Sequence, residues 1–294
     1  MGGLVLRLLL SGALVYTLVF LAFAVLPVDP ARAVLGPAAD PSAVEDLRMR
    51  YGLDRPILER FAQVALAQIQ GDFGASVIWG QPVWDVLGPA MGRTLARLFV
   101  ALGLGLAAAA MVSSYVVSRD VRGVRSFLMV VAGAPGFVSL ILILSFLTDS
   151  FSAPPSTNPT LYEAVAVLWA SVMTAAIVGL PLMERLDFRR NRTRQAEFLL
   201  FLHAPPDAVT GILMRGAWPT ALAATANAAT GALTVLAFAE YVFGLEGFAI
   251  PFFRACLSGD LAIVTFGSLM LAWCFLTLQT TVEAAARWMD RRLN

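Results

Sequence analysis

The chain has 294 residues, of which 59% are hydrophobic and 14% are charged, and its mean hydropathy is +0.76. This composition excludes an ordinary soluble domain and is typical of a protein that crosses a membrane several times. The formal net charge is +1, and every basic residue is an arginine. Without a lysine the chain can form neither a Walker A phosphate loop nor a Schiff base.

The chemistry-bearing residues are sparse. His203 is the only histidine, and the two cysteines, Cys256 and Cys274, have neither metal-ligand spacing nor the pattern of a disulfide framework. A catalytic triad or a His–carboxylate metal cluster cannot be assembled from this set. We therefore expect no catalytic residue and no metal site in this chain.

An apolar run from Leu4 to Val28 opens the chain. At about 25 residues it is long enough to cross the ~30 Å hydrocarbon layer of a bilayer. It is also longer than the ~7–15-residue apolar region of a signal peptide. We expect residues 1–28 to form a retained first transmembrane helix, with cleavage after Ala24 as the alternative.

Residues 29–92 form the one long water-soluble segment. Asp40 followed by Pro41 is typical of a capped helix start, and Gly52 ends that helix. Asp54 is predicted to cap a second helix with one apolar face. Six residues at helical spacing make up that face: Ile57, Leu58, Phe61, Val64, Ala65 and Ile69. A turn is expected at Gly71–Gly74, and both helices are too short to cross a membrane.

Five more apolar runs follow in residues 93–294, so the fold class predicted is an all-α polytopic membrane protein with six transmembrane helices. The runs are Thr94–Val117, Ser126–Thr148, Leu161–Met183, Thr220–Phe243 and Leu261–Ala286. Kinks are expected where glycine and proline meet, at Gly133–Gly136 and Gly179–Pro181. An even number of spans places both termini on the same side of the membrane.

Arginines predict which side is cytoplasmic, because short cytoplasmic loops carry an excess of basic residues. They gather in the loop Ser118–Arg125, in the interval Glu184–Pro219 and in the C-terminal tail, whereas Asp149–Thr160 has none. We therefore place these three regions and the N-terminus in the cytoplasm. Residues 29–92 then form an extracytoplasmic helical segment.

The interval 184–219 contains two short amphipathic runs separated by Pro205 and Pro206. Each proline lacks an amide donor, and the second disfavours helical geometry at the first, so a helix cannot continue through the pair. A helix, a break and a second helix are expected on the cytoplasmic side. This arrangement suits docking onto a soluble partner.

The fifth span is rich in small and hydroxyl residues and carries Asn227, Thr230 and Thr234. Two interpretations remain open: a helix that lines a polar path, or a packing helix at the centre of the bundle. Glu240 lies near the outer end of the same span. A carboxylate deep in a bilayer suggests a functional residue, but near the interface an ordinary interfacial glutamate is favoured.

Two motifs in the water-soluble segment carry a resemblance to a known family. The stretch Tyr51–Pro56 (YGLDRP) followed by Gly71–Gly74 (GDFG) resembles the segment after the first span in ABC-importer permeases of the dipeptide/oligopeptide/nickel family, dipeptide-permease B type. Near the other end, Glu240–Gly244 (EYVFG) is similar to another run of that family. The resemblance extends over the whole chain.

The resemblance implies the transmembrane domain of a type I ABC importer, in which the interval 184–219 corresponds to the cytoplasmic "EAA" coupling loop. The matching or adjoining positions are Glu197, Phe198, His203, Ala204, Pro205, Pro206, Asp207 and Arg215. The sequence departs from the family where Pro206 replaces a characteristic glycine. It also departs in the approach Phe201–Pro205.

Partners are also implied by the resemblance: a homologous second permease, two ATPase domains that bind ATP and Mg²⁺, an extracytoplasmic solute-binding protein and the lipid bilayer, with no nucleic acid. The chain itself would bind no cofactor and catalyse no reaction. The location implied is the plasma membrane of a bacterium or archaeon. The transported solute is left open between peptides, nickel chelates and similar small molecules.

A secondary transporter driven by an ion gradient is the rival hypothesis. It would use buried ionisable residues near the middle of the membrane, and the central parts of these spans have almost none. A polytopic membrane enzyme is a weaker third hypothesis, since it needs the catalytic groups that this sequence lacks.

Overall fold

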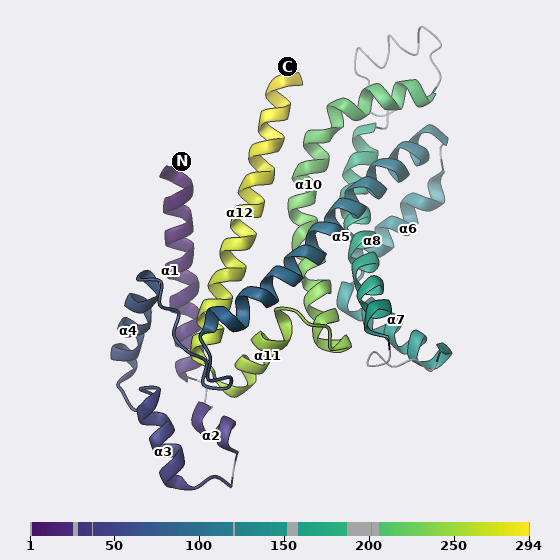
Figure 1. Cartoon of the computed structure of the whole chain (residues 1–294). Coiled ribbons are helices and arrows are strands. Elements are labelled where there is room, and N and C mark those ends of the chain that lie inside the picture. The colour runs from purple at the N-terminus through teal and green to yellow at the C-terminus, as the bar shows by residue number, and fades with distance from the viewer. Residues whose placement is uncertain are drawn as a thin grey trace. The chain divides into compact units, whose positions relative to one another are not determined.

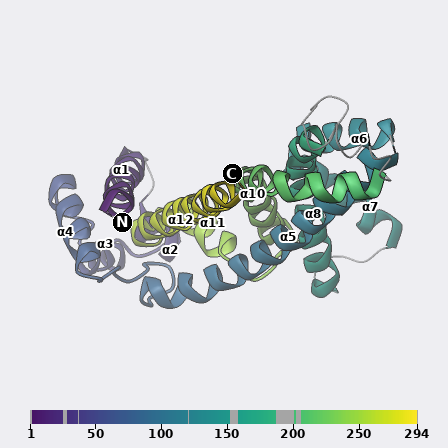
Figure 2. The same cartoon turned by 90° about the horizontal axis from the view of Figure 1, so that it is seen from above.

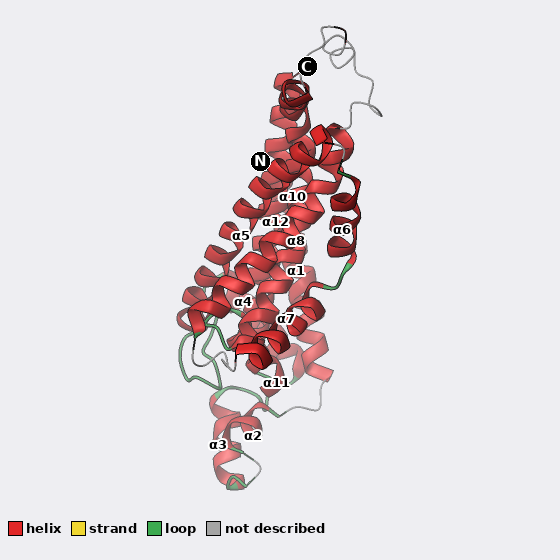
Figure 3. Ribbon diagram, turned by 90° about the vertical axis from the view of Figure 1, so that its right-hand side faces the viewer, coloured by secondary structure: helices red, strands yellow, loops and turns green. Residues whose placement is uncertain are grey.

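A computed structural model describes residues 2–25, 29–36, 38–119, 121–151, 158–186, 201 and 206–293. Nearly all of these residues are helical, and their one β-pairing is an isolated bridge between Ala75 and Pro82 (Figure 3). The helices are α1 (Gly2–Val25), α2 (Pro30–Leu35), α3 (Pro41–Arg50), α4 (Ile57–Ile69), α5 (Val83–Arg119), α6 (Arg122–Gly133), α7 (Gly136–Phe151), α8 (Pro159–Leu186), α10 (Pro206–Phe243), α11 (Ala249–Ser258) and α12 (Leu261–Leu293). The all-helical class expected from the sequence is confirmed for the described residues.

The chain divides into two compact units. The first unit comprises Met1–Arg93 and Glu246–Leu276, and the second comprises Thr94–Leu245 and Thr277–Asn294. Helices α5 and α12 each contribute one part to the first unit and the other part to the second.

In the first unit, α4 packs along α1 (Figure 1). The contact is aromatic: the rings of Tyr16 and Phe20 in α1 pack against the ring of Phe61 in α4, at centroid distances of 5.0 and 5.2 Å. The Tyr16 hydroxyl donates to the Phe61 carbonyl at 2.7 Å. Such ring pairs add to the free energy of burying their surface. They explain how a short amphipathic helix is held against an apolar one.

Only part of the predicted apolar face of α4 is covered. Phe61, Val64 and Ala65 pack against α1, but Leu58 and Ile69 are more than four-fifths exposed. The expected start of α4 is wrong, because the helix begins at Ile57 with Pro56 at its cap. A proline disfavours helical geometry at the residue before it, which is Arg55 here. A helix capped at Asp54 would have to include Arg55, so the helix begins after Pro56 instead.

Other local predictions for this segment are confirmed. The Asp40 carboxylate accepts a hydrogen bond from the Ser42 amide at 3.1 Å and so caps α3, which has Pro41 at its first position. Gly52 lies just beyond α3 with a φ of +61°, and the turn at Gly71–Gly74 has positive φ at both glycines. Glycine reaches this region without a steric penalty.

In the second unit, α8 and α10 pack side by side along most of their length (Figure 1, Figure 2). Small residues of α10 lie at this contact, among them Ala228, Ala229 and Ala232, which are at most 2% exposed. Helix α5 also comes close to α8 at one point: a Cβ added to Gly105 would lie 2.4 Å from the Thr174 Cβ. Close backbone approach through small residues is how helices associate in a lipid environment.

Among the residues that the structure describes, four helices are long and apolar enough to cross a membrane, or up to five if a bent pair is counted as one span. This supports a multi-pass membrane protein, and the count of six remains a prediction. The bent pair corresponds to the expected span Ser126–Thr148, where Gly123–Gly133 and Gly136–Thr148 meet at 100°. A simple kink was expected there. Pro135 and the extended Ala134 interrupt the helix between two glycines, so helical hydrogen bonds do not hold the two halves in line.

Candidate functional site

A buried ionic cluster in the second unit joins three helices. The Arg97 guanidinium of α5 donates to Glu240 of α10 at 3.0 Å and to Glu163 of α8 at 2.7 Å. The Thr94 hydroxyl donates to the same oxygen of Glu240 at 2.6 Å. The Glu240 side chain is only 1% exposed, whereas that of Glu163 is 44% exposed. The Arg97 guanidinium thus pairs with one buried carboxylate, that of Glu240, and with one accessible carboxylate, that of Glu163.

Glu240 is therefore not the ordinary interfacial glutamate that the sequence favoured. Its carboxylate is enclosed and paired, and burial of an unpaired charge would be very unfavourable. The cluster fixes one end of the unit, because it joins the beginnings of the second-unit part of α5 and of α8 to the end of α10. At the opposite end of α8, Glu184 accepts from Arg125 of α6 at 3.3 Å.

The other three path candidates lie together on a different face of α10. Asn227, Thr230 and Thr234 are all exposed, at a spacing of three and four residues. The Thr234 hydroxyl donates to the Thr230 carbonyl of its own helix. Helix α10 is thus two-sided within its unit, with alanines against α8 and a polar stripe that other residues of the unit leave accessible. We call Asn227, Thr230 and Thr234 the polar stripe.

Most of the expected coupling loop lies outside the described residues, including Glu197, Phe198, His203, Ala204 and Pro205. Pro206 and Asp207 begin α10, and Arg215 lies within it. The second short helix of the predicted loop is therefore continuous with the fifth span. Figure 1 shows α10 bending in its first part, and Pro219 inside the helix removes one backbone hydrogen bond there.

A buried carboxylate also organises the first unit. Asp260 is fully buried, precedes α12 and accepts hydrogen bonds from the Ser76 hydroxyl and from the amides of Val77 and Ile78. Its other oxygen accepts from the Ile263 amide at 3.4 Å, in the first turn of α12. The loop after the Gly71–Gly74 turn is thereby tied to the start of the last helix, far away in the sequence.

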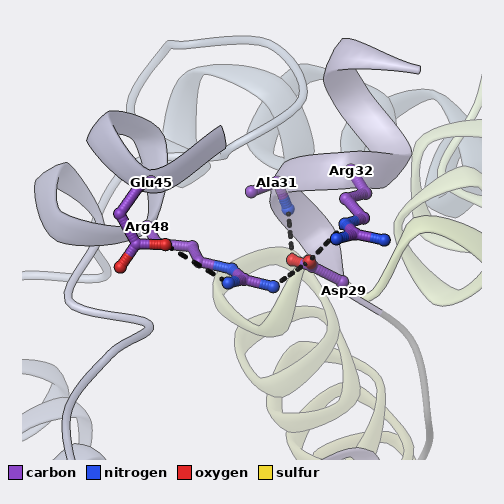
Figure 4. A network of polar contacts seen from close by, with 5 residues as sticks. All are labelled: Asp29, Ala31, Arg32, Glu45 and Arg48. Atoms are coloured by element: carbon purple, nitrogen blue, oxygen red, sulfur yellow. Dashed lines mark hydrogen bonds and ion pairs between the residues drawn. The ribbon is translucent and has the colours of Figure 1, made fainter. Parts of the chain in front are cut away.

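A more exposed network joins α2 to α3 (Figure 4). Asp29 caps α2 through the Ala31 amide and pairs with Arg32 and with Arg48 of α3, which also binds Glu45. Burial alone would raise the pKa of Asp29, but the hydrogen bond and charge of Arg48, together with backbone amides, hold it below its ordinary value. Asp29 is therefore ionised at neutral pH and keeps both pairs.

Sequence reasoning missed Arg97, Glu163 and Asp260. The available signal was an ionisable residue just inside or just before an apolar run, because such residues are rare there unless they are paired. Asp260 also directly precedes Leu261, the first residue of α12, and aspartate at this position is a typical helix cap. Which charges pair with one another could not be read from the chain. Among the described residues, no group of three or more His, Cys, Asp or Glu could hold a metal ion.

Comparison with known proteins concerns the N-terminal third of the chain. Residues 1–95 match the model of a family described as the N-terminal part of the membrane component of binding-protein-dependent transport systems. The matched stretch is about a third of the chain. It contains both motifs, YGLDRP and GDFG, on which the resemblance to importer permeases rested. That resemblance is confirmed over this stretch.

Individual proteins similar to this chain are also transport permeases. The glutathione transport system permease protein GsiC of Escherichia coli strain K12 is 37% identical over 99 residues, which are 32% of each chain. The same protein of Shigella flexneri serotype 5b matches equally, and that of Escherichia coli strain CFT073 is 36% identical over the same length. The chain therefore matches about a third of the length of these relatives.

Proposed function

We propose that the chain is a permease subunit of an ATP-driven ABC importer and carries a peptide or similar small solute across the plasma membrane. The observation that carries the proposal is the family match of residues 1–95, since that family consists of membrane components of binding-protein-dependent transport systems. A glutathione permease among the relatives favours a small peptide-like solute. Nickel chelates and other small solutes remain the alternative within the same mechanism.

The partners proposed are a homologous permease, two ATPase domains and an extracytoplasmic solute-binding protein. ATP and Mg²⁺ would be bound by the ATPase domains. The coupling loop 184–219, with Glu197 and the Pro205-Pro206 break, would dock onto them and transmit their closure to the spans. The permease itself makes no covalent bond and needs no catalytic residue.

The proposed topology has both termini in the cytoplasm and residues 29–92 outside. Two contacts in the second unit support it. The Arg97 cluster joins the start of the second span, the start of the fourth and the end of the fifth, all of which the arginine bias places outside. The pair of Arg125 and Glu184 joins the start of the third span to the end of the fourth, both placed inside.

The test is a transport measurement on the purified complex. Expressed with its neighbouring subunits, the chain should copurify with an ATPase, and proteoliposomes should take up labelled glutathione or a labelled dipeptide when ATP and the binding protein are both supplied. The rival secondary transporter predicts uptake that persists without ATP and stops when ionophores dissipate the ion gradient. That result, or a chain that never copurifies with an ATPase, would refute the proposal.

We further propose that the polar stripe of α10 lines the solute path. An amide and two hydroxyls on an exposed helix face are poorly suited to lipid, and they suit a partner subunit or a hydrated path. Asn227→Leu should lower uptake several-fold and leave the copurified ATPase unchanged, because Asn227 is exposed within its unit.

The matched control is Ser145→Leu. Ser145 is also an exposed polar residue on a helix and donates only to its own helix, at the Ile141 carbonyl. Its neighbours Leu142 and Phe146 are exposed and apolar, as expected of a lipid-facing surface. Uptake by this variant should be normal. Equal uptake by both variants would instead favour the packing interpretation of the fifth span.

A further inference from the structure

A pocket lies in the first unit between the end of α3, helix α4 and the start of α12. Its volume is about 120 Å³. The walls are formed by Tyr51, Gly52, Leu53, Arg60, Gln63, Val64, Ala75, Val77, Gly259, Leu261 and Ala262. Small-molecule sites enclose about 300–1,000 Å³, so this pocket is too small for a peptide and has room for the end of one side chain.

Arg60 is the cation of this pocket, and it is half-buried. In the described part of the chain no carboxylate lies within ion-pair distance of its guanidinium. Three carboxylates of the unit are engaged elsewhere: Asp29 and Glu45 with Arg48, and Asp260 with the Ser76 loop. Burial lowers the pKa of Arg60, and no neighbouring charge offsets that effect.

The polar neighbour of Arg60 is also a donor. The side-chain oxygen of Gln63 accepts a hydrogen bond from Arg55 at 2.8 Å, so the group that Gln63 can offer to a ligand is its NH₂. The Tyr51 hydroxyl donates to the Ser76 carbonyl. A guanidinium and an amide NH₂ together suit an anion, and the planar fork of arginine matches a carboxylate best.

We propose that this pocket receives the carboxylate of an aspartate or glutamate side chain presented by the solute-binding protein when it docks. The inference rests on the proposed function, which places residues 29–92 on the extracytoplasmic side. Two observations favour a protein as the source of the carboxylate. The pocket is too small for a peptide substrate, and a single ion pair would hold a free carboxylate only weakly.

Exposed apolar residues on the two helices that border the pocket, α3 and α4, suit a protein surface as well. Leu58 and Ile69 of α4 are 83% and 82% exposed, and Met49 of α3 is 56% exposed. Interfaces between proteins combine apolar contacts with a few charged anchors, and arginine is common among the residues that dominate their affinity. Arg60 would be such an anchor.

The test measures binding of the solute-binding protein to the complete complex in nanodiscs. Arg60→Gln should weaken binding about tenfold, because loss of one partner of a partly buried pair costs more than loss of a surface pair. Arg254→Gln is the matched control: it removes the same charge from an exposed site in the same unit that does not line the pocket. This variant should bind like the wild type.

Two further measurements identify the group that is bound. Arg60→Glu should abolish binding, and one Asp→Arg or Glu→Arg variant of the binding protein should restore it. Sodium acetate should weaken wild-type binding more than sodium chloride at the same ionic strength, and this difference should vanish in Arg60→Gln.

The outcomes are distinguishable. Equal affinity of Arg60→Gln and the wild type would refute the proposal while leaving the importer assignment intact. A changed solute dependence of uptake in Arg60→Gln, with unchanged binding of the solute-binding protein, would show that the pocket holds the solute's carboxylate instead. If the wild-type complex binds no solute-binding protein and contains no ATPase, the proposed function itself has failed. Thermal unfolding of each variant confirms that α4 remains folded.

Discussion

Arg97→Met should destabilise the second unit by about 3–5 kcal/mol. The substitution leaves the Glu240 carboxylate, which is 1% exposed, without the cation that donates to it at 3.0 Å. Methionine fills much of the space of the arginine stem, so the expected loss is mainly that of charge compensation rather than of packing. The measurement is the midpoint of thermal unfolding in detergent, where about 2–4 °C corresponds to each kcal/mol for a unit of this size.

Two variants separate charge from packing. Glu163→Gln removes a partner of Arg97 that is 44% exposed, and it should cost less than about 1 kcal/mol. The double variant Arg97→Met with Glu240→Gln removes the buried charge together with its partner and should recover much of the lost stability. If Arg97→Met alone is as stable as the wild type, the buried pair is not what holds these three helices together.

Local features of the N-terminal segment could be predicted because neighbouring residues determine them. The cap at Asp40 and the glycines at 52, 71 and 74 depend on backbone geometry within a few positions, and the structure has them as expected. The sequence pattern predicts a cap at Asp54, but α4 begins only at Ile57, after Pro56. The proline decides where a helix can begin, and it acts on the residue before it.

Long-range features could not be predicted in this way. The 100° break between α6 and α7 follows from an ordinary glycine–proline pattern, but its size depends on what each half packs against. One such contact is Gly136, where an added Cβ would lie 2.5 Å from a methyl carbon of Val235 in α10. Nothing near Gly136 in the sequence indicates that residue.

The candidate site was predicted in part. Composition sets the fifth span apart from the other spans, but it does not indicate which side of that helix is packed. Burial separates Glu240, paired inside the unit, from the exposed polar stripe. In the sequence, Asn227, Thr230, Thr234 and Glu240 form one group because they belong to the same helix. In the structure they lie on two different faces of that helix, so only the first three are exposed together.

Asp260→Ala should cost about 3–5 kcal/mol of the stability of the first unit. Three hydrogen bonds from the loop to a buried carboxylate would be lost, from the Ser76 hydroxyl and from the amides of Val77 and Ile78, and the buried Ser76 and Val77 donors would lose this acceptor. The first turn of α12 would also lose its cap at the Ile263 amide, worth about 1 kcal/mol. The expected result is release of the loop 71–82 from the start of α12.

Hydrogen exchange of peptides from residues 71–82 measures that release directly, and Asp72→Ala is its matched control. Asp72 lies in the same loop and also accepts a backbone amide, that of Gly74 at 2.9 Å, but it is exposed, so its loss should cost no more than about 1 kcal/mol. Asp260→Asn keeps one oxygen as an acceptor and should fall between the two. If exchange is equal in Asp260→Ala and Asp72→Ala, the buried carboxylate does not hold the loop, and the walls of the Arg60 pocket are kept in place by other contacts.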